Sequence, residues 1–192
     1  MSLFTFVNKG ITDEEQMLGK ARDGDKAAIE WLYRHHVRYL SALCSRYITD
    51  DEDIRDVMQE AFIRIFSSLD SFTYRGKGSL KAWMARITLN ETLAFIRKRT
   101  RFDTVDIDRH DIDTTEEDVE TEGITDDVLH QFIQELPEGY RTVFNLYVIE
   151  ERSHKEIAEL LGIKPNTSAS QLYKAKAILA SRIRQYRTTN SI

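Results

Sequence analysis

Between residues 74 and 101, eight Lys and Arg side chains face a single acidic one, and aromatic rings lie among them. This local surplus of positive charge indicates binding to a polyanion. Aromatic rings beside cations suit single-stranded nucleic acid, because unstacked bases pack on the rings while the cations neutralise phosphates. Phe72 and Tyr74 fall in a loop and are candidates for such stacking. Trp83 and Phe95 can instead belong to a hydrophobic core.

An acidic stripe precedes this cationic stretch. Between residues 50 and 60, six acidic side chains stand against one arginine. Residues three and four positions apart share one face of a helix, and here that face carries Asp56, Gln59, Glu60 and Ile63. Such a face either docks on a basic protein surface or is simply solvated. The residues alone leave both interpretations open.

The C-terminal part has the pattern of a helix-turn-helix. Ser153 and Glu156 form a capping box at the start of one short helix, and Gly162 suits the left-handed residue that ends it. In the next helix, residues 167–187 carry five cations and no acid, as entry into a DNA major groove requires. A charged solvent-facing helix would share this composition. The residues expected at base edges or phosphates are Thr167, Ser168, Ser170, Gln171 and Lys174.

The sequence shows no catalytic or metal-binding constellation. Cys44 is the only cysteine, so a disulfide within the chain is excluded, and no paired Cys/His spacing indicates a zinc site. Asp51 and Asp53 would point about 200° apart on a helix, which disfavours shared metal binding. His36 falls in an apolar helical series and is interpreted as a packed residue. We therefore expect no enzyme, no metal and no cofactor.

The single cysteine fits a reducing cytoplasm. The first residues lack a basic stretch followed by a long apolar run, and no uncharged segment of 18 residues occurs. We expect a protein that is neither exported nor inserted into a membrane.

The elements that position these side chains are predicted to be helices, giving an all-α fold. Two Pro and eight Gly in 192 residues argue against a sandwich or a loop-dominated scaffold. Apolar periodicity and capping residues predict helices over 12–21, 26–47, 49–66, 128–136, 140–148 and 153–161, and from 166 onward.

An acidic segment separates two groups of helices. Residues 103–127 carry one basic and twelve acidic groups, a net charge of −11, with little apolar periodicity. Such a segment cannot bury enough surface to offset its ordering entropy, so we expect a flexible linker between domains over 1–102 and 128–192. A calcium-binding loop is the alternative, but the regular ligand spacing and the central Gly are missing.

These motifs together resemble those of an extracytoplasmic-function sigma factor of bacterial RNA polymerase. DEDIRDVMQEAF at 51–62 is similar to the family's polymerase-docking helix. GSLKAWMARI at 78–87, followed by Asn90 and the basic run at Arg97, is similar to the segment that melts and reads the minus-ten element. LPEGYRTVF at 136–144 and EIAELLGI at 156–163 are similar to the reader of the minus-thirty-five element.

The resemblance implies three sets of contact residues. For docking on core polymerase they are Asp51, Asp53, Asp56, Gln59, Glu60 and Ile63. For the minus-ten element they are Phe72, Tyr74, Arg75, Lys77, Lys81, Trp83, Arg86, Asn90, Arg97 and Lys98. For the minus-thirty-five element they are Thr167, Ser168, Ser170, Gln171, Tyr173, Lys174 and Lys176. A flipped base is expected in a pocket near residues 72–81 and Asn90.

The chain departs from the family pattern in two places. Ala94 stands where the family usually has an Asp, which puts one contact or cap in question. The recognition helix lacks the usual Gly-Thr-Val start and carries lysines where arginines are usual. Because Lys cannot form the planar two-bond fork of Arg, we expect more phosphate positioning than guanine readout from this helix.

The resemblance names core RNA polymerase and promoter DNA as partners and makes an anti-sigma factor a further expected partner. A helix-turn-helix transcription regulator that binds DNA without touching polymerase is the alternative. A metal-dependent nuclease using the carboxylates at 50–60 ranks lower, because no nucleophile, base and metal set converges there.

Overall fold

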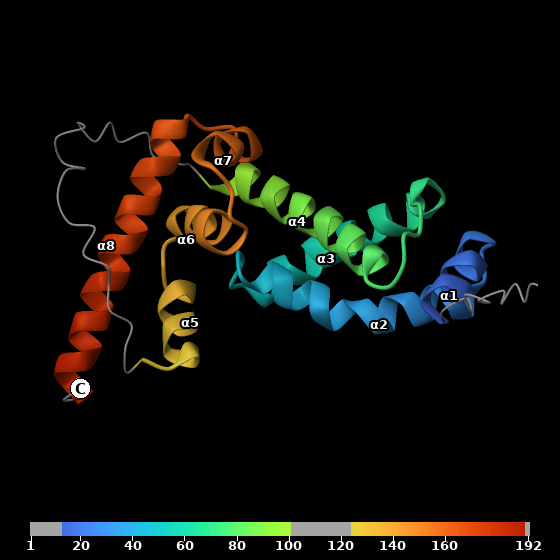
Figure 1. Ribbon diagram of the computed structural model, residues 1–192, viewed down its shortest axis with the longest axis horizontal. Helices are drawn as coiled ribbons and strands as arrows, with labels where there is room; N and C mark the ends of the chain where they lie inside the picture. The colour runs from blue at the N-terminus through green and yellow to red at the C-terminus, as the bar shows by residue number, and fades with distance from the viewer. Residues whose placement is uncertain (1–12, 101–123, 191–192) are drawn as a thin grey trace, which may run out of the picture. The chain divides into compact units, whose positions relative to one another are not determined.

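The computed structural model describes residues 13–100 and 124–190, and every regular element in these ranges is helical (Figure 1). The all-α prediction is therefore confirmed for the described part. Contacts divide the chain into two units. Unit 1 runs to Cys44 and includes Arg55–Glu91, whereas unit 2 comprises Ser45–Ile54 and the chain from Thr92 onward. Residues 45–54 and 92–100, which the sequence assigns to the first domain, thus group with the C-terminal helices.

Residues 13–100 contain four α-helices and one 3₁₀ turn. In chain order they are α1 (Asp13–Arg22), α2 (Lys26–Ser45), α3 (Asp51–Ser67), η1 (Leu69–Ser71) and α4 (Ser79–Arg99). The side chain of Asp25 caps α2, since its Oδ1 accepts hydrogen bonds from the amides of Ala27 and Ala28 at 2.8 and 3.0 Å.

The cap of α3 lies one residue later than the sequence suggests. Asp50 Oδ1 accepts hydrogen bonds from the backbone amides of Glu52 and Asp53 at 2.9 and 3.0 Å. Asp50 rather than Thr49 is therefore the N-cap. The negative charge of the Asp50 carboxylate is also stabilised by the positive end of the helix dipole, so Asp50 is a better N-cap than Thr49.

Unit 1 is built around an apolar core shared by its helices. The residues there that are less than 2% exposed include Leu18, Ala28, Leu32, Leu40, Ala61, Ile65, Leu80 and Met84. The aromatic ring of Phe62 packs against Tyr33 and Phe66, at 4.6 and 5.7 Å between centroids. The apolar period predicted for α3 is confirmed, because Val57, Met58 and Ile65 all face this core.

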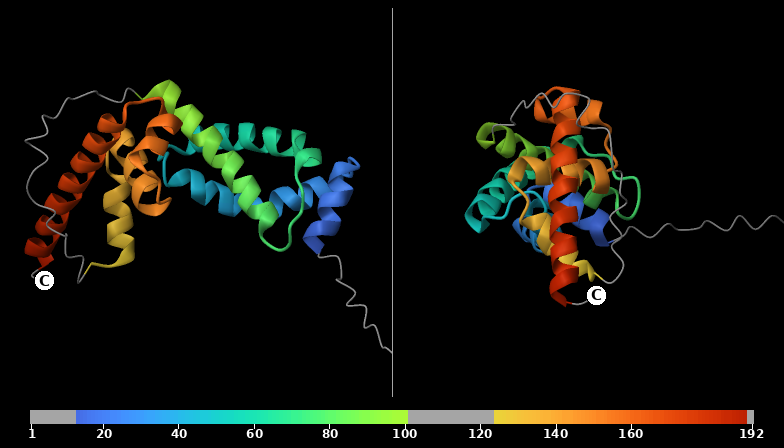
Figure 2. Two further views of the ribbon diagram at one scale, coloured as in Figure 1. Left: turned by 45° about the horizontal axis from the view of Figure 1, so that its top comes forward. Right: turned by 90° about the vertical axis from the view of Figure 1, so that its left-hand side faces the viewer.

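Unit 2 contains the C-terminal helices, which lie along one side of α8 (Figures 1 and 2). In chain order they are α5 (Asp126–Gln134), α6 (Glu138–Phe144), the π-helical turn η3 (Asn145–Ile149), α7 (His154–Leu161) and α8 (Pro165–Asn190). The helix predicted over 140–148 thus changes its hydrogen-bond pattern at Asn145. Leu136, Ala175 and Leu179 form a buried cluster that Phe132, Tyr140 and Phe144 cover.

Two boundaries in this unit differ from the sequence interpretation. α5 begins at Asp126, so Asp126 and Asp127 belong to its first turn rather than to the linker, and acidic residues there suit the helix dipole. The segment 101–123, which holds most of the expected linker, lies outside the described residues. α8 begins at Pro165 instead of after Asn166, since Pro is preorganised for the first helical position.

The turn between α7 and α8 follows the prediction. The Ser153 hydroxyl and the Glu156 side chain form the reciprocal capping box at the start of α7. Gly162 has a φ of 69° in the left-handed region, where a side chain would be strained. The helix-turn-helix geometry expected from the sequence is therefore present.

Arg141 fixes several turns of unit 2 from the interior. Arg141 is 4% exposed, and its guanidinium donates hydrogen bonds to three backbone carbonyls. Nε and Nη2 reach Tyr47 O at 3.1 and 3.0 Å, and Nη1 reaches Gln134 O and Leu136 O at 2.6 and 2.8 Å. Asn145 adds a bond to Arg46 O at 2.7 Å. Burial lowers the pKa of Arg141.

None of the helices in residues 13–100 and 124–190 combines the length and the apolar character that a membrane span requires.

Candidate functional site

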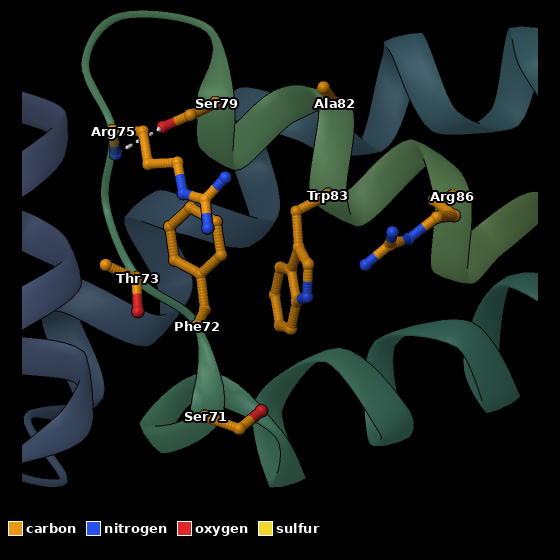
Figure 3. Close-up of a pocket in the computed structure, with 8 residues that line it drawn as sticks. All are labelled: Ser71, Phe72, Thr73, Arg75, Ser79, Ala82, Trp83 and Arg86. Atoms are coloured by element: carbon orange, nitrogen blue, oxygen red, sulfur yellow. Dashed lines mark hydrogen bonds between the residues drawn. The ribbon is translucent and has the colours of Figure 1, made fainter.

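A cavity of about 520 Å³ opens at the start of α4, where the loop after η1 returns to the helix (Figure 3). It is lined by Ser71, Phe72, Thr73, Arg75, Ser79, Ala82, Trp83 and Arg86. The wall therefore combines two aromatic rings, two guanidinium groups and several hydroxyls. All of these residues belong to unit 1.

Phe72 and Trp83 form the apolar wall of this cavity. Their ring centroids are 4.9 Å apart with an interplanar angle of 35°. Phe72 lies in the loop directly after η1, as the sequence predicts, but it is only 9% exposed because its ring packs against Trp83. Trp83 is half-buried and offers its remaining surface to the cavity.

The loop from Phe72 to α4 is fixed at its far end by Ser79. The Ser79 hydroxyl accepts a hydrogen bond from Arg75 N at 3.1 Å and donates one to Gly76 O at 2.7 Å. Gly76 and Gly78 have φ values of 108° and 86°, which residues with a Cβ rarely adopt. The glycines that the sequence places in this loop therefore have a defined structural role.

Charge around the cavity comes from two arginines. In Figure 3 Trp83 lies between Phe72 and Arg86, and the Arg75 side chain overlaps the Phe72 ring in this view; both arginines are exposed. Guanidinium groups at this position can bind phosphate or the acceptor edge of a base. Lys81, in contrast, places its ammonium 3.8 Å from the centroid of the Tyr39 ring and does not line the cavity.

The other residues expected at the minus-ten element do not line the cavity either. Lys77, Asn90, Arg97 and Lys98 are exposed, and Tyr74 is half-buried. The structure thus brings together Phe72, Arg75, Trp83 and Arg86 and adds hydroxyl groups that the sequence analysis missed. Ser71, Thr73 and Ser79 carry no periodic or charge signal, so only the fold could place them there.

The acidic stripe lies on the outer face of α3. Asp51, Asp56, Gln59 and Glu60 are exposed, and Ile63 is 58% exposed although it is aliphatic. Asp53 differs, since it is half-buried and its carboxylate accepts a hydrogen bond from Arg99.

The start of α8 does not present all the residues expected at DNA. Thr167, Ser168, Ser170 and Gln171 are 5, 0, 6 and 3% exposed. The Ser168 hydroxyl lies 2.9 Å from His154 Nδ1, and the Ser170 hydroxyl donates to Asn166 O at 2.8 Å. These four side chains therefore lie in the interior and not on the surface where the sequence analysis expects them. Ser168 and Gln171 lie four positions before Leu172 and Ala175 of the inward series, so they share its face.

The outward face of α8 carries a different set. Tyr173 is 38% exposed and Lys176 is exposed, as expected, whereas Lys174 is half-buried with Nζ 5.9 Å from the centroid of the Tyr140 ring. Asn166 is exposed on the same helix and was missed. Its position could have been found by taking the helical phase from the inward series at Leu172, Ala175 and Leu179.

In residues 13–100 and 124–190, no group of three His, Cys, Asp or Glu side chains is arranged to hold a metal ion.

Known proteins are similar to this chain over most of its length. The "ECF RNA polymerase sigma-E factor" of Haemophilus influenzae is 27% identical over 88% of this chain and 95% of that protein. The "RNA polymerase sigma-H factor" of Pseudomonas aeruginosa is 29% identical, over 85% and 90%. A solved structure, "Structure of CnrH in complex with the cytosolic domain of CnrY", covers 88% of this chain and 96% of that chain, with 24% identity and a TM-score of 0.44.

Two family descriptions match the two helical regions. "Sigma-70 region 2" matches residues 32–102, and "Sigma-70, region 4" matches residues 126–179. The chain therefore belongs to the sigma-70 family. Within it the chain is an extracytoplasmic-function sigma factor, a non-enzymatic subunit that directs promoter-specific initiation by RNA polymerase. This identification decides against a regulator that acts without polymerase and against a nuclease.

Proposed function

We propose that the cavity at the start of α4 captures one unstacked base of the minus-ten element and so holds the promoter open. The observation that carries this proposal is the combination of Phe72, Trp83, Arg75 and Arg86 around one cavity. Its volume, about 520 Å³, falls within the usual range of about 300–1,000 Å³ for small-molecule pockets. A base can stack on the rings while the guanidinium groups hold its acceptor edge or the adjacent phosphates.

Base capture alone cannot open DNA. Separating about ten base-pair steps costs roughly 14 kcal/mol, at a mean of about 1.4 kcal/mol per step. Two or three captured bases return about 2–9 kcal/mol. The remaining free energy has to come from core RNA polymerase, which is the partner that a sigma subunit requires.

We further propose that the outer face of α3 is the polymerase-docking surface, with Asp51, Asp56, Gln59, Glu60 and Ile63 in contact. Asp53 joins this contact once its hydrogen bond to Arg99 is replaced by one to core polymerase. At the other end of the chain, Tyr173, Lys176 and Asn166 on the exposed face of α8 meet the minus-thirty-five element. The lysine favours phosphate contacts over guanine readout there.

The proposal also covers the cellular location of the protein and its inhibition by a partner. We place it in the cytoplasm, because its template and core polymerase are there. An anti-sigma factor stays a prediction from the family resemblance. Co-purification of the chain from its own cells would reveal such a partner, and loss of that partner would raise transcription from the dependent promoters.

The experiment that tests the proposal is transcription in vitro. Core polymerase is incubated with genomic fragments, with and without this protein, and RNA start sites are mapped. Start sites that appear only with the protein define its promoters. On those promoters, Trp83→Ala should reduce open-complex yield by roughly tenfold, since a stacking ring contributes about 1–3 kcal/mol. Unchanged open-complex yield would remove the cavity from the mechanism.

A further inference from the structure

The loop that forms the cavity is anchored at only one end by the interactions described above. Ser79 holds its far end on α4, through Arg75 and Gly76. At the near end, the backbone leaves η1 with a single turn-type bond from Phe72 N to Leu69 O at 3.2 Å. The position of the Phe72 ring, and with it the apolar wall, therefore depends on what else holds this end.

A side chain from outside the cavity supplies that second anchor. Arg22 is the last residue of α1. Its Nε donates a hydrogen bond to Leu69 O at 3.0 Å, and its Nη2 donates one to Phe72 O. The guanidinium thus bridges the two carbonyls at either end of the η1 turn. Charge-assisted bonds of this kind are stronger than bonds between neutral groups.

The helix that carries Arg22 is itself well fixed. Leu18 and Ala21 of α1 are 1% and 5% exposed, so this helix packs against the core of unit 1. After Arg22 the chain turns through Gly24, whose φ is 83°, and Asp25 then caps α2. Residues 13–22 lie before the part of the chain that matches sigma-70 region 2. The anchor thus reaches the cavity from a helix outside that match.

We propose that Arg22 is a positioning residue for base capture: its two-bond fork fixes the backbone at Phe72, and thereby the ring on which the base stacks, without touching DNA. The inference rests on the proposed function of the cavity. Lysine has no planar fork and reaches one carbonyl at a time, so charge at this position is not sufficient. Loss of the fork leaves η1 and α1 in place but frees the Phe72 backbone.

The first test detects the ring itself in the free protein. The chain has two tryptophans, Trp31 and Trp83, so Trp31→Phe leaves Trp83 as the only reporter. In that background, Arg22→Gln should shift Trp83 emission to longer wavelength and make it more accessible to acrylamide, because Phe72 no longer covers it. The matched control is Lys20→Gln, which removes an equal charge from the same turn of α1. It should leave the emission unchanged. Identical spectra for Arg22→Gln and the control would overturn the proposal.

The second test uses the holoenzyme on a promoter mapped as above, with 2-aminopurine placed at each minus-ten position in turn. At the position that brightens with the native protein, Arg22→Gln should reduce the captured fraction by roughly tenfold, while affinity for core polymerase stays within about twofold. Arg22→Lys should remain close to Arg22→Gln. Full recovery with lysine would mean that charge near DNA matters rather than the fork, and the proposal would fail.

The outcomes separate this inference from the proposed function. If no position brightens with the native protein, base capture by the cavity is wrong, and the role of Arg22 falls with it. If the native protein captures a base and Arg22→Gln captures it equally well, only the role of Arg22 is wrong. If Arg22→Gln loses core-polymerase affinity and base capture to the same extent, Arg22 supports the general fold, and the positioning role is again rejected.

Discussion

Gln171 lies on the recognition helix but faces the interior, and its Oε1 has no hydrogen-bond partner among the described residues. An unsatisfied buried acceptor costs about 1–3 kcal/mol. Gln171→Met keeps the length of the side chain and removes the amide, so the free energy of unfolding should stay level or rise by about 1 kcal/mol. Denaturant unfolding measures this change, and promoter binding by anisotropy should stay within about twofold. Weaker promoter binding at undiminished stability would return Gln171 to the DNA interface.

Lys176 is an exposed cation of the same helix. If it contacts a phosphate, Lys176→Ala should weaken promoter binding and make the dependence of log K on log salt shallower by about one unit. Lys174→Ala is the comparison, since that ammonium is directed toward the Tyr140 ring and should change the slope less. Titrations at several salt concentrations decide. A larger change for Lys174 would mean that the helix rotates on binding.

His36 makes the stability of unit 1 depend on pH. It is 3% exposed, and burial lowers its pKa to about 4, with His35 and Lys81 acting in the same direction. Glu14 Oε1 lies 3.8 Å from its Nε2 and favours the charged form, but burial dominates. The unfolded chain therefore takes up a proton near pH 6.5, whereas the folded protein does so only near pH 4.

The free energy of unfolding should therefore be unaffected by this group above about pH 6.5 and fall as the pH drops toward 4, by at most about 3 kcal/mol. Thermal unfolding between these pH values checks the fall. In His36→Gln the dependence should be weaker, and in His130→Gln, which replaces an exposed histidine, it should persist. Equal pH profiles for the native protein and His36→Gln would contradict the assignment.

At the scale of elements, α5 is secured by two arginines of different burial. Arg141 satisfies carbonyls of Gln134, Leu136 and Tyr47 from the interior, so Arg141→Met leaves them without donors and should cost about 2–4 kcal/mol. Arg182 bonds Phe132 O at 3.0 Å and pairs with Glu135 at 3.1 Å, but it is partly exposed. Arg182→Met should cost about 1 kcal/mol or less. Equal losses for both in denaturant unfolding would mean that burial is not what distinguishes the two clamps.

The helices with strict apolar periods were the predictable part of the fold. α3 and the turn at Gly162 follow from spacing and capping chemistry, because each depends on residues within a few positions of one another. The start of α8 was less determined, since Pro165 and the two capping residues after it compete for the same boundary. The boundary does not set the phase of the helix: the inward series at Leu172 and Ala175 already places Ser168 and Gln171, four positions earlier, on the buried face.

The cavity also separates residues that the sequence can predict from residues that only the fold can place. Its rings and arginines were predicted as a group, because charge and aromatic character are visible in the sequence. Arg22 was not, because its partner carbonyl at Leu69 lies 47 residues away and backbone carbonyls carry no sequence signal. Local chemistry predicts where charged and aromatic side chains gather, whereas the residues that position them depend on tertiary contacts.

At the scale of the whole molecule, the uneven charge predicts different partners for different surfaces. The net charge is −5, yet the chain carries an acidic stripe on α3 and cationic residues on α4 and α8. Asp56 and Glu60 are exposed, four residues apart and on one face of α3. Reversing both charges removes attraction to a basic partner without disturbing the core on the opposite face.

Asp56→Arg with Glu60→Arg should therefore reduce affinity for core polymerase by about tenfold or more, with a change of sign in its salt dependence, while the free energy of unfolding shifts by less than about 1 kcal/mol. Competition binding against the native protein measures the affinity. Glu15→Arg with Asp70→Arg changes the net charge equally at exposed sites away from the stripe, and it should bind normally. Equal losses for both double variants would attribute the effect to net charge. Normal binding by the α3 variant would place the docking surface elsewhere on the chain.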